Sequence, residues 1–225
     1  AALHASLYIM TPPETSWRSF SIYLEPLEGV ILGPLAGFVA SFIGSAAART
    51  VKPDPLWMFG IFAEPMGVLA CALLAKRRWK PLAAIYAFML VFYFIHPYGR
   101  QLPLWTIVDI FVAYMLIYPV SRFSGSLLGE NSKRLVIHYS IISFISVVTD
   151  SLTRVFLFVP LGLYSVVGIP TFELLEAVFI AGAFYSYIED GISLLSAILV
   201  GVPILLTLRR TPFMHVISGH QKDGS

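Results

Sequence analysis

The sequence predicts an all-α fold, a polytopic transmembrane bundle of about six spans with one extra partial or re-entrant segment. Hydrophobic residues make up 57% of the 225 positions, whereas Asp, Glu, Lys and Arg make up only 12%. Roughly a quarter of the residues in an ordinary soluble domain are charged. Several continuous apolar stretches also approach the roughly 20 residues that a helix needs to cross the hydrocarbon core of a bilayer. We therefore expect an integral, multi-pass protein of the cell membrane.

The bundle is expected to form one domain, residues 1–210, followed by a polar tail, residues 211–225. The first apolar stretch, residues 1–10, is half the length of a span and stops at Thr11-Pro12-Pro13, because proline cannot continue a helix. We expect this first helix to be truncated. We expect residues 14–23 to form an interfacial loop that carries amphipathic side chains.

Residues 24–48 form the next expected span, and small residues recur in it at every fourth position. They are Gly33, Gly37 and Ser41, and also Ala40, Gly44 and Ala48. Small residues at this spacing let helix backbones approach closely, so we expect a tightly packed face.

The remaining spans follow at regular intervals and are separated by short polar loops. The expected spans are residues 57–75, 81–95, 104–120 and 135–159. The last apolar stretch, residues 172–208, is far longer than one crossing requires. We expect it to contain two shorter helices hinged near Glu189-Asp190-Gly191.

Basic residues cluster in three places, residues 76–80, 122–134 and 209–210. The positive-inside rule places all three in the cytoplasm. With a cytoplasmic amino terminus, strict alternation through residues 24–48 would put residues 76–80 outside. Either one segment does not cross fully or the amino terminus lies outside, and the sequence leaves both alternatives open.

Ionisable side chains within the apolar stretches are candidate functional residues, because each costs about 2.5–3.5 kcal/mol at mid-membrane on insertion scales. They are Glu25, Glu28, Glu64, Asp109, Asp150, Arg154, Glu189 and Asp190. Adjacent acids at membrane depth need water or a ligand, so Glu189 and Asp190 are the strongest candidates for a substrate site.

The other acids have alternative interpretations. Asp150 and Arg154 are four residues apart and face each other on a helix, either as a structural ion pair or as ligand contacts. Glu64 precedes Pro65, which would break the helix and border a polar cavity, or else Glu64 is hydrogen-bonded to a neighbouring helix. Asp109 lies near one end of its span, where solvation at the membrane interface would also explain it.

Several classes of protein are not expected from this sequence. The net charge of +2 is too small to indicate a nucleic-acid partner. The motifs of P-loop ATPases, zinc proteases and esterases are missing, so we do not expect an enzyme. The five histidines are scattered and Cys71 is the lone cysteine, so we expect no metal and no cofactor.

The opening AALHASLYIM, with its A-x-x-x-A spacing, the loop leading into EPLEGVILGPLAGFVASFIG, and the small spans ending in basic loops together resemble a known family. The family that they resemble is the substrate-binding S-components of energy-coupling factor (ECF) vitamin transporters. The resemblance extends over the whole chain and is most recognisable over residues 1–80. The truncated first helix and the long acidic final stretch depart from the family pattern.

The resemblance implies a substrate-capture subunit for a small water-soluble vitamin or related micronutrient, surrounded by membrane lipid. Its partners would be a coupling transmembrane subunit and ATPase subunits that hydrolyse ATP. Ala1 and Ala5 would then face the coupling subunit, and Trp17 and Arg18 would lie in the loop over the ligand. The expected substrate-binding set is Trp17, Arg18, Glu28, Glu64, Asp150, Arg154, Tyr187, Glu189 and Asp190.

Two other functions are compatible with the sequence. A stand-alone secondary transporter would use intramembrane carboxylates as proton or sodium sites, although no internal repeat supports it. A membrane-embedded enzyme would need a constellation of residues that spacing alone does not reveal. For a capture protein, the excess of carboxylates would suit a cationic substrate.

Overall fold

The computed structural model describes residues 1–11, 20–53, 56–123 and 132–208, and every regular element within these ranges is a helix. The prediction of an all-α bundle is confirmed. Five helices of the described part are long and apolar enough to cross a membrane, and the helix over residues 79–95 is a shorter apolar one. The predicted polar tail, residues 211–225, lies outside the described residues.

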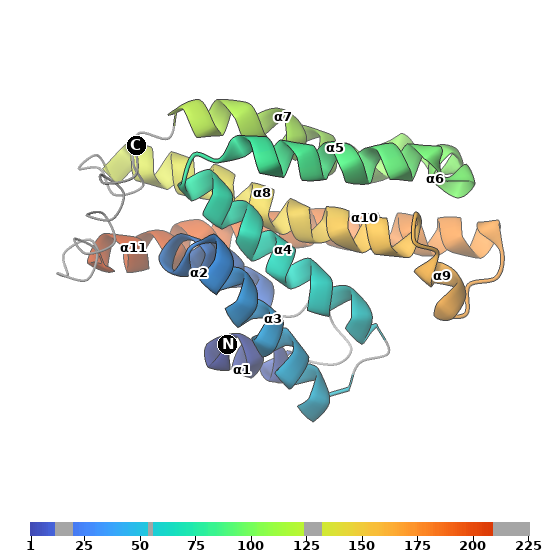
Figure 1. The fold of residues 1–225 in the computed structure, drawn as a ribbon, viewed down its shortest axis with the longest axis horizontal. Helices are drawn as coiled ribbons and strands as arrows, with labels where there is room; N and C mark the ends of the chain where they lie inside the picture. Colours follow the sequence, from blue (N-terminus) through green and yellow to red (C-terminus); the bar gives the residue numbers. More distant parts are fainter. Residues whose placement is uncertain (12–19, 54–55, 124–131, 209–225) are drawn as a thin grey trace.

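The helices follow one another with short connections (Figure 1). In chain order they are α1 (Ala2–Met10), η1 (Phe20–Tyr23), α2 (Glu25–Leu32), α3 (Pro34–Val51), α4 (Trp57–Ala75), α5 (Trp79–Ile95), α6 (Pro97–Gln101), η2 (Leu104–Ile107), α7 (Val108–Phe123), α8 (Ser132–Phe158), α9 (Leu163–Val166), α10 (Phe172–Ser196), η3 (Ala197–Gly201) and α11 (Val202–Leu208). The expected spans over residues 57–75, 81–95, 104–120 and 135–159 correspond to α4, α5, η2 with α7, and α8.

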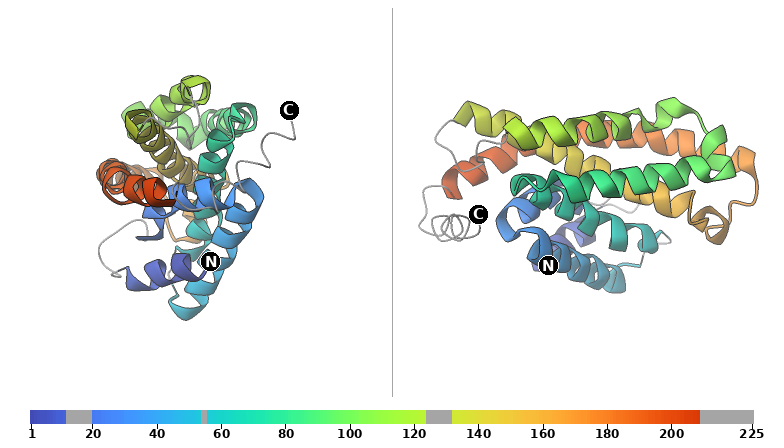
Figure 2. Two further views of the ribbon diagram at one scale, coloured as in Figure 1. Left: turned by 90° about the vertical axis from the view of Figure 1, so that its left-hand side faces the viewer. Right: turned by 45° about the horizontal axis from the view of Figure 1, so that its top comes forward.

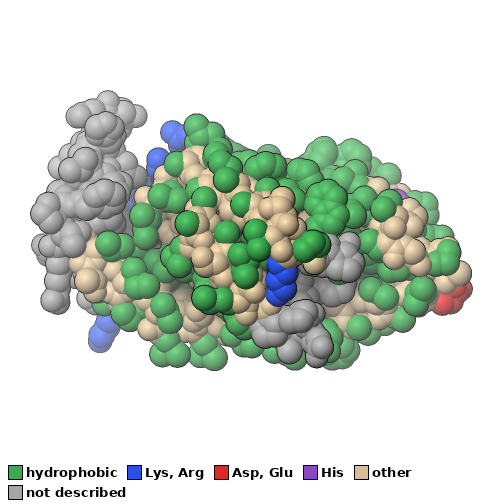
Figure 3. Space-filling view, turned by 90° about the horizontal axis from the view of Figure 1, so that it is seen from below, with side chains coloured by type: hydrophobic (Ala, Val, Ile, Leu, Met, Phe, Trp, Pro, Cys, Tyr) green, Lys and Arg blue, Asp and Glu red, His purple; other side chains and the backbone are tan. Residues whose placement is uncertain are grey.

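Helices α4 and α8 form the centre of the bundle. They pack against each other, and they are the most buried of the long apolar helices, with 67% of the α4 span and 78% of the α8 span buried inside the protein. Helices α5 and α7 cover them on one side and α1–α3 on the other (Figures 1 and 2). The segment α10–α11 is the most exposed of the long spans. On the face that Figure 3 shows, hydrophobic side chains are spread along the whole length of the bundle and few charged side chains are visible.

The predicted span over residues 24–48 is divided into two helices by Gly33. Gly33 has φ +79° and ψ −179°, a conformation that is essentially restricted to glycine, and Pro34 then begins α3. The eight residues of α2 rise only about 12 Å, less than half of the hydrocarbon core. Helix α2 is therefore too short to cross by itself, whereas α3 is long enough, and both alternatives for the orientation stay open.

Small residues allow α2 and α3 to pack closely on their neighbours, as their spacing predicted. A Cβ atom at Gly29 would clash with the backbone of Val68 on α4, and one at Gly44 would clash with the Ala1 carbonyl of the α1 segment. Most of the buried hydrophobic residues between Leu27 and Leu205 belong to one connected hydrophobic cluster.

The expected hinge near Glu189-Asp190-Gly191 was wrong. Helix α10 continues through Gly191 to Ser196, and the irregularity lies later, in the π-helical turn η3. Pro203 explains this position, because it has no N–H to donate to the carbonyl of Leu199 and its ring would clash with that carbonyl in a regular α-helix.

Seven of the eleven Lys and Arg residues of the described part gather at one end of the bundle, which we call the basic end, whereas Arg100 lies on α6. There α4 and α7 end, α5 and α8 begin, and α11 ends (Figure 1). The residues are Lys76, Arg77, Arg78, Lys80, Arg122, Lys133 and Arg134. Helices α6 and α9 and the first turns of α7 and α10 lie at the opposite end.

Candidate functional site

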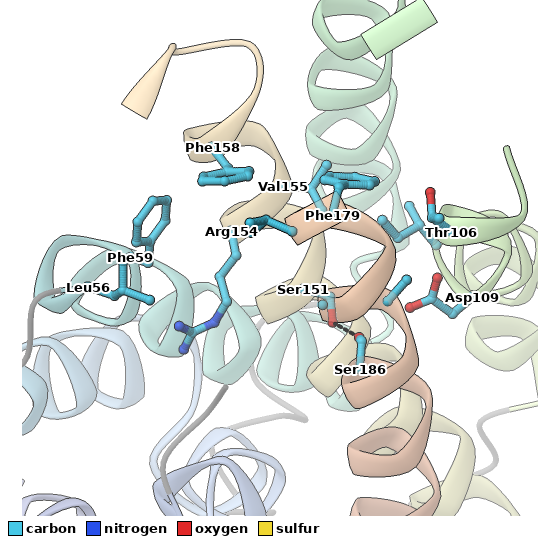
Figure 4. A pocket seen from close by; sticks show the side chains of 14 residues that line it. Leu56, Phe59, Thr106, Asp109, Ser151, Arg154, Val155, Phe158, Phe179 and Ser186 are labelled. Atoms are coloured by element: carbon cyan, nitrogen blue, oxygen red, sulfur yellow. Dashed lines mark hydrogen bonds between the residues drawn. The ribbon is translucent and has the colours of Figure 1, made fainter. Parts of the chain in front are cut away.

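A pocket lies between the start of α4, the start of α7, the last turns of α8, and α10 (Figure 4). Its empty volume is about 720 Å³, which includes space open to the solvent. Its lining residues are Leu56, Phe59, Thr106, Asp109, Ile110, Ser151, Arg154, Val155, Phe158, Val178, Phe179, Gly182, Ala183 and Ser186. Leu56 immediately precedes α4 and Phe158 ends α8, so the pocket lies in the half of the bundle opposite the basic end.

The pocket walls are mainly apolar and aromatic. The rings of Phe59 and Phe158 meet edge to face with their centroids 5.8 Å apart, and Phe179 forms another wall (Figure 4). The hydroxyl groups of Ser151 and Ser186 lie 3.2 Å apart and link α8 to α10. An apolar cavity with a few convergent polar groups is typical of a small-molecule site.

Two ionisable residues line this pocket, Asp109 on α7 and Arg154 on α8. Their exposed fractions are 7% and 8%. Asp109 lies in the first turn of α7, where the positive end of the helix dipole favours a carboxylate. In Figure 4 the Arg154 guanidinium and the Asp109 carboxylate lie on opposite sides of the pocket.

The predicted pairing of Asp150 with Arg154 is present. Arg154 Nε lies 2.5 Å from Asp150 Oδ2, and Arg154 Nη2 lies 3.1 Å from Asp150 Oδ1. The same Nη2 atom is 3.9 Å from Oε1 of Glu64 on α4. Arg154 therefore joins the pocket to a set of charged residues on the helices nearer the amino terminus.

Glu64 is the centre of this set, which we call the buried charge network. Its Oε1 atom accepts a hydrogen bond from Arg49 Nη2 at 2.7 Å, and its Oε2 atom lies 2.9 Å from His4 Nε2. Ser45 donates to the same Oε2 atom, and His4 Nδ1 lies 3.0 Å from Glu28 Oε2. The network comprises His4, Glu28, Ser45, Arg49, Glu64, Asp150 and Arg154, and it ties α1, α2, α3, α4 and α8 together.

Two neighbouring residues accommodate the Arg49 side chain in this network. The guanidinium of Arg49 lies 4.4 Å from the centre of the Tyr8 ring, a cation–π contact. A Cβ atom at Gly60 would collide with that guanidinium, so glycine provides the space for it.

Helix α4 continues through Pro65, so the break expected there is absent and Glu64 instead hydrogen-bonds to neighbouring helices.

Part of the network has the order of a serine hydrolase triad. The Ser45 hydroxyl, the His4 imidazole and the Glu28 carboxylate follow one another at 3.2 Å and 3.0 Å. Ser45 and His4 have no exposed surface, however, and neither lines the pocket. A substrate carbonyl cannot reach the hydroxyl in this arrangement, so we interpret it as structural.

The other predicted site residues on α10 lie beside the pocket rather than in its wall. Glu189 and Asp190 are buried within about one turn of Ser186, and the Tyr187 hydroxyl donates to the carbonyl of Trp105 on η2. Glu28 belongs to the network. Trp17 and Arg18 lie outside the described residues, so their predicted position over a ligand stays a prediction.

The predicted coupling residues both lie on or just before α1. Ala1 is exposed and its carbonyl approaches Gly44 of α3, whereas Ala5 is half-buried. Contact of these residues with a coupling subunit stays a prediction.

Sequence reasoning missed most of the pocket wall and three of the seven network residues, His4, Ser45 and Arg49. The three phenylalanines, Ser151 and Ser186 lie on apolar helices where nothing marks them individually. His4 and Arg49 were also missed as site residues. An ionisable residue within an apolar stretch was the available signal for both.

Comparison with known proteins gives one distant relative. The chain is 25% identical over 132 residues to an uncharacterized protein of Methanocaldococcus jannaschii. The match spans 57% of this chain and 44% of that protein, less than half of the relative's length. No family model and no solved structure matches the chain.

Among the described residues, no group of three or more His, Cys, Asp or Glu side chains has the geometry to hold a metal ion. The candidate site is therefore the pocket, with Asp109 and Arg154 as its charged walls and the buried charge network behind Arg154.

Proposed function

We propose that this chain is the substrate-capture subunit of an ECF-type importer for a small water-soluble vitamin or related micronutrient. It would reside in the cell membrane and work with a coupling transmembrane subunit and separate ATPase subunits. The observation that carries the proposal is the pocket in the half of the bundle opposite the basic end. The transporter class comes from the resemblance of residues 1–80 to S-components.

The position of the pocket suits capture from outside the cell. The positive-inside rule assigns the basic end to the cytoplasm, so the pocket belongs to the outer half of the membrane. A solute ring can pack between Phe59, Phe158 and Phe179 while its polar groups meet hydroxyl and charged side chains. Since the chain has no phosphate-binding loop, the energy for uptake would come from partner subunits.

The second candidate is a stand-alone secondary transporter coupled to protons or sodium. The observation that favours it is the number of acids with exposed fractions of 7% or less within the bundle, namely Glu25, Glu64, Asp109, Asp150, Glu189 and Asp190. Intramembrane carboxylates are common proton and sodium sites. Glu64 and Asp150 are ion-paired with arginines.

Two experiments test the proposal. Native mass spectrometry of the purified chain should detect a retained small molecule, and Ser186→Leu should abolish its retention. Uptake of that molecule into proteoliposomes should require ATP and the coupling and ATPase subunits of an ECF transporter. Uptake by the chain alone, driven by an ion gradient, would overturn the proposal and support the secondary transporter.

A further inference from the structure

A cluster of exposed cations lies at the basic end, where α4 passes into α5 beside the end of α7 (Figure 1). We call it the cationic cluster, and it comprises Arg77, Arg78, Lys80 and Arg122. All four residues are exposed, and none of them forms an ion pair within the part of the chain that the structure describes. The described residues therefore leave this positive charge uncompensated.

The turn between α4 and α5 holds Arg77 in a backbone conformation that side chains rarely adopt. Arg77 has φ 58°, the only positive φ outside glycine in the described part. Its N–H group donates to the carbonyl of Leu74 at 2.9 Å, and that of Arg78 donates to Leu73 at 2.8 Å. Glycine usually occupies this position after a helix, because a Cβ atom there is strained. The chain thus keeps a cationic side chain at a place where the backbone favours none.

Two aromatic rings lie directly beside these cations. Trp79 on α5 and Tyr118 on α7 meet edge to face, with their ring centroids 5.1 Å apart. The Arg122 guanidinium carbon lies 5.4 Å from the centre of the Tyr118 ring, and Arg122 Nε donates to the Tyr118 hydroxyl at 3.1 Å. Trp and Tyr are enriched where a bilayer meets water. These contacts hold Arg122 next to α5 at the depth expected for lipid headgroups.

Exposed apolar side chains continue from the cations along both helices. On α5, Lys80 and Phe88 lie eight positions apart, and on α7, Met115, Tyr118 and Arg122 follow at spacings of three and four. Residues at these spacings share one face of a helix. Phe88 is 53% exposed and Met115 is 74% exposed. Each face therefore has a cation at the basic end and apolar surface further along, which is the order of a lipid headgroup and its acyl chains.

We propose that the cationic cluster and the adjoining faces of α5 and α7 bind an anionic phospholipid. Its phosphate lies among Arg78, Lys80 and Arg122, and its acyl chains lie against Phe88 and Met115. Clusters of four or more Lys and Arg beside a membrane span attract anionic headgroups, and arginine suits phosphate in particular. An acidic protein surface would match the cations but not the apolar faces. This inference goes beyond substrate capture and does not depend on what the pocket binds.

Native mass spectrometry of the purified full chain measures lipid binding directly. The probes are dioleoylphosphatidylglycerol, which is anionic, and dioleoylphosphatidylcholine, which has no net charge and the same acyl chains. The wild-type chain should bind the anionic lipid about fivefold more tightly or better, as expected for several basic side chains at one headgroup. Equal affinity for the two lipids would overturn the proposal and favour an acidic protein surface as the partner of the basic end.

Single charge removals locate the site on the basic end. Arg122→Gln and Arg78→Gln should each lower affinity for the anionic lipid about fivefold. Lys76→Gln is the matched control, because Lys76 is an exposed cation of the same end whose Nζ atom lies near Gly33, on the α2 side of α4. It should lower affinity by less than about twofold, since its charge is farther from the headgroup. Equal losses in Lys76→Gln and Arg122→Gln would overturn the site between α5 and α7.

Two further measurements separate lipid binding from folding and from substrate capture. Melting temperatures in lipid-free detergent should be nearly unchanged, because the substituted residues are exposed. Retention of a small molecule in the pocket should also be unchanged, because none of these residues lines it. A folded Arg122→Gln and a folded Arg78→Gln that both keep the wild-type preference for the anionic lipid would overturn the proposal.

Discussion

Arg49 Nη2 and Glu64 Oε1 lie 2.7 Å apart in the interior of the bundle, with exposed side-chain fractions of 5% and 1%. This contact joins α3 to α4, and Glu64 also meets His4 of α1 and approaches Arg154 of α8. One acid thus holds four helices through charged partners. Removing it should therefore affect more than one contact.

We expect Glu64→Gln to destabilise the protein strongly. The substitution leaves Arg49 without its main counter-charge, and breaking a buried ion pair in this way costs about 3–5 kcal/mol. Thermal unfolding of the purified protein in detergent measures the effect. Glu173→Gln should change stability by less than about 0.5 kcal/mol, as is usual for exposed positions. A Glu64→Gln variant as stable as this control would contradict the structural role of the network.

Gly60 should be intolerant of even one methyl group. Gly60→Ala would place a Cβ atom against the guanidinium of Arg49 and move it away from Glu64. The expected loss is about 1–3 kcal/mol, typical of overpacking. In contrast, a Cβ atom at Gly191 on α10 meets nothing within 4 Å, so Gly191→Ala should stabilise that helix by about 0.5–1 kcal/mol. Melting temperatures that fall equally for the two variants would contradict this.

The break at Gly33 should depend on its backbone conformation. Asparagine tolerates the left-handed conformation of Gly162, with φ 72° and ψ 18°, but not the extended positive-φ conformation of Gly33. We expect Gly33→Asn to cost about 1–3 kcal/mol, and Gly162→Asn to cost clearly less. Unfolding midpoints of the two variants would test this, and equal losses would argue against strain at Gly33.

Ser186→Leu should block the pocket without unfolding the bundle. The added side chain enters the pocket and removes the contact with Ser151, so retention of the native small molecule should fall at least tenfold. Ser196→Leu makes the same change at a half-buried position on the same helix outside the pocket wall, and it should retain the molecule. Native mass spectrometry measures the retained molecule in both variants. Unchanged retention in Ser186→Leu would show that the molecule does not bind in this pocket.

The two ends of the bundle should face opposite sides of the membrane. Cys71 is fully buried, so an introduced cysteine will dominate labelling by an impermeant thiol reagent. We expect Leu161→Cys, near α9, to be labelled in intact cells, and Lys80→Cys, at the basic end, to be labelled only after the cells are opened. The reverse pattern would place the pocket toward the cytoplasm and contradict capture from outside.

Much of the bundle could be predicted because its signals are local. The apolar stretch over residues 57–75 has the bounds of α4 itself, since hydrophobic length alone determines such a helix. The pairing of Asp150 with Arg154 follows from the geometry of one helix turn. The hinge expected at Gly191 failed because a glycine only permits a bend, whereas Pro203 prevents the regular hydrogen bond.

The sequence by itself determined that this protein is an all-α bundle rich in apolar helices, where most of those helices begin and end, and which ionisable residues lie within them. Only the tertiary structure decided which of these residues meet. His4 and Glu64 are 60 positions apart, and Ser151 and Ser186 are 35 apart. Their contacts depend on how helices pack across the bundle, and that packing is set by the shapes of many side chains at once rather than by any local pattern.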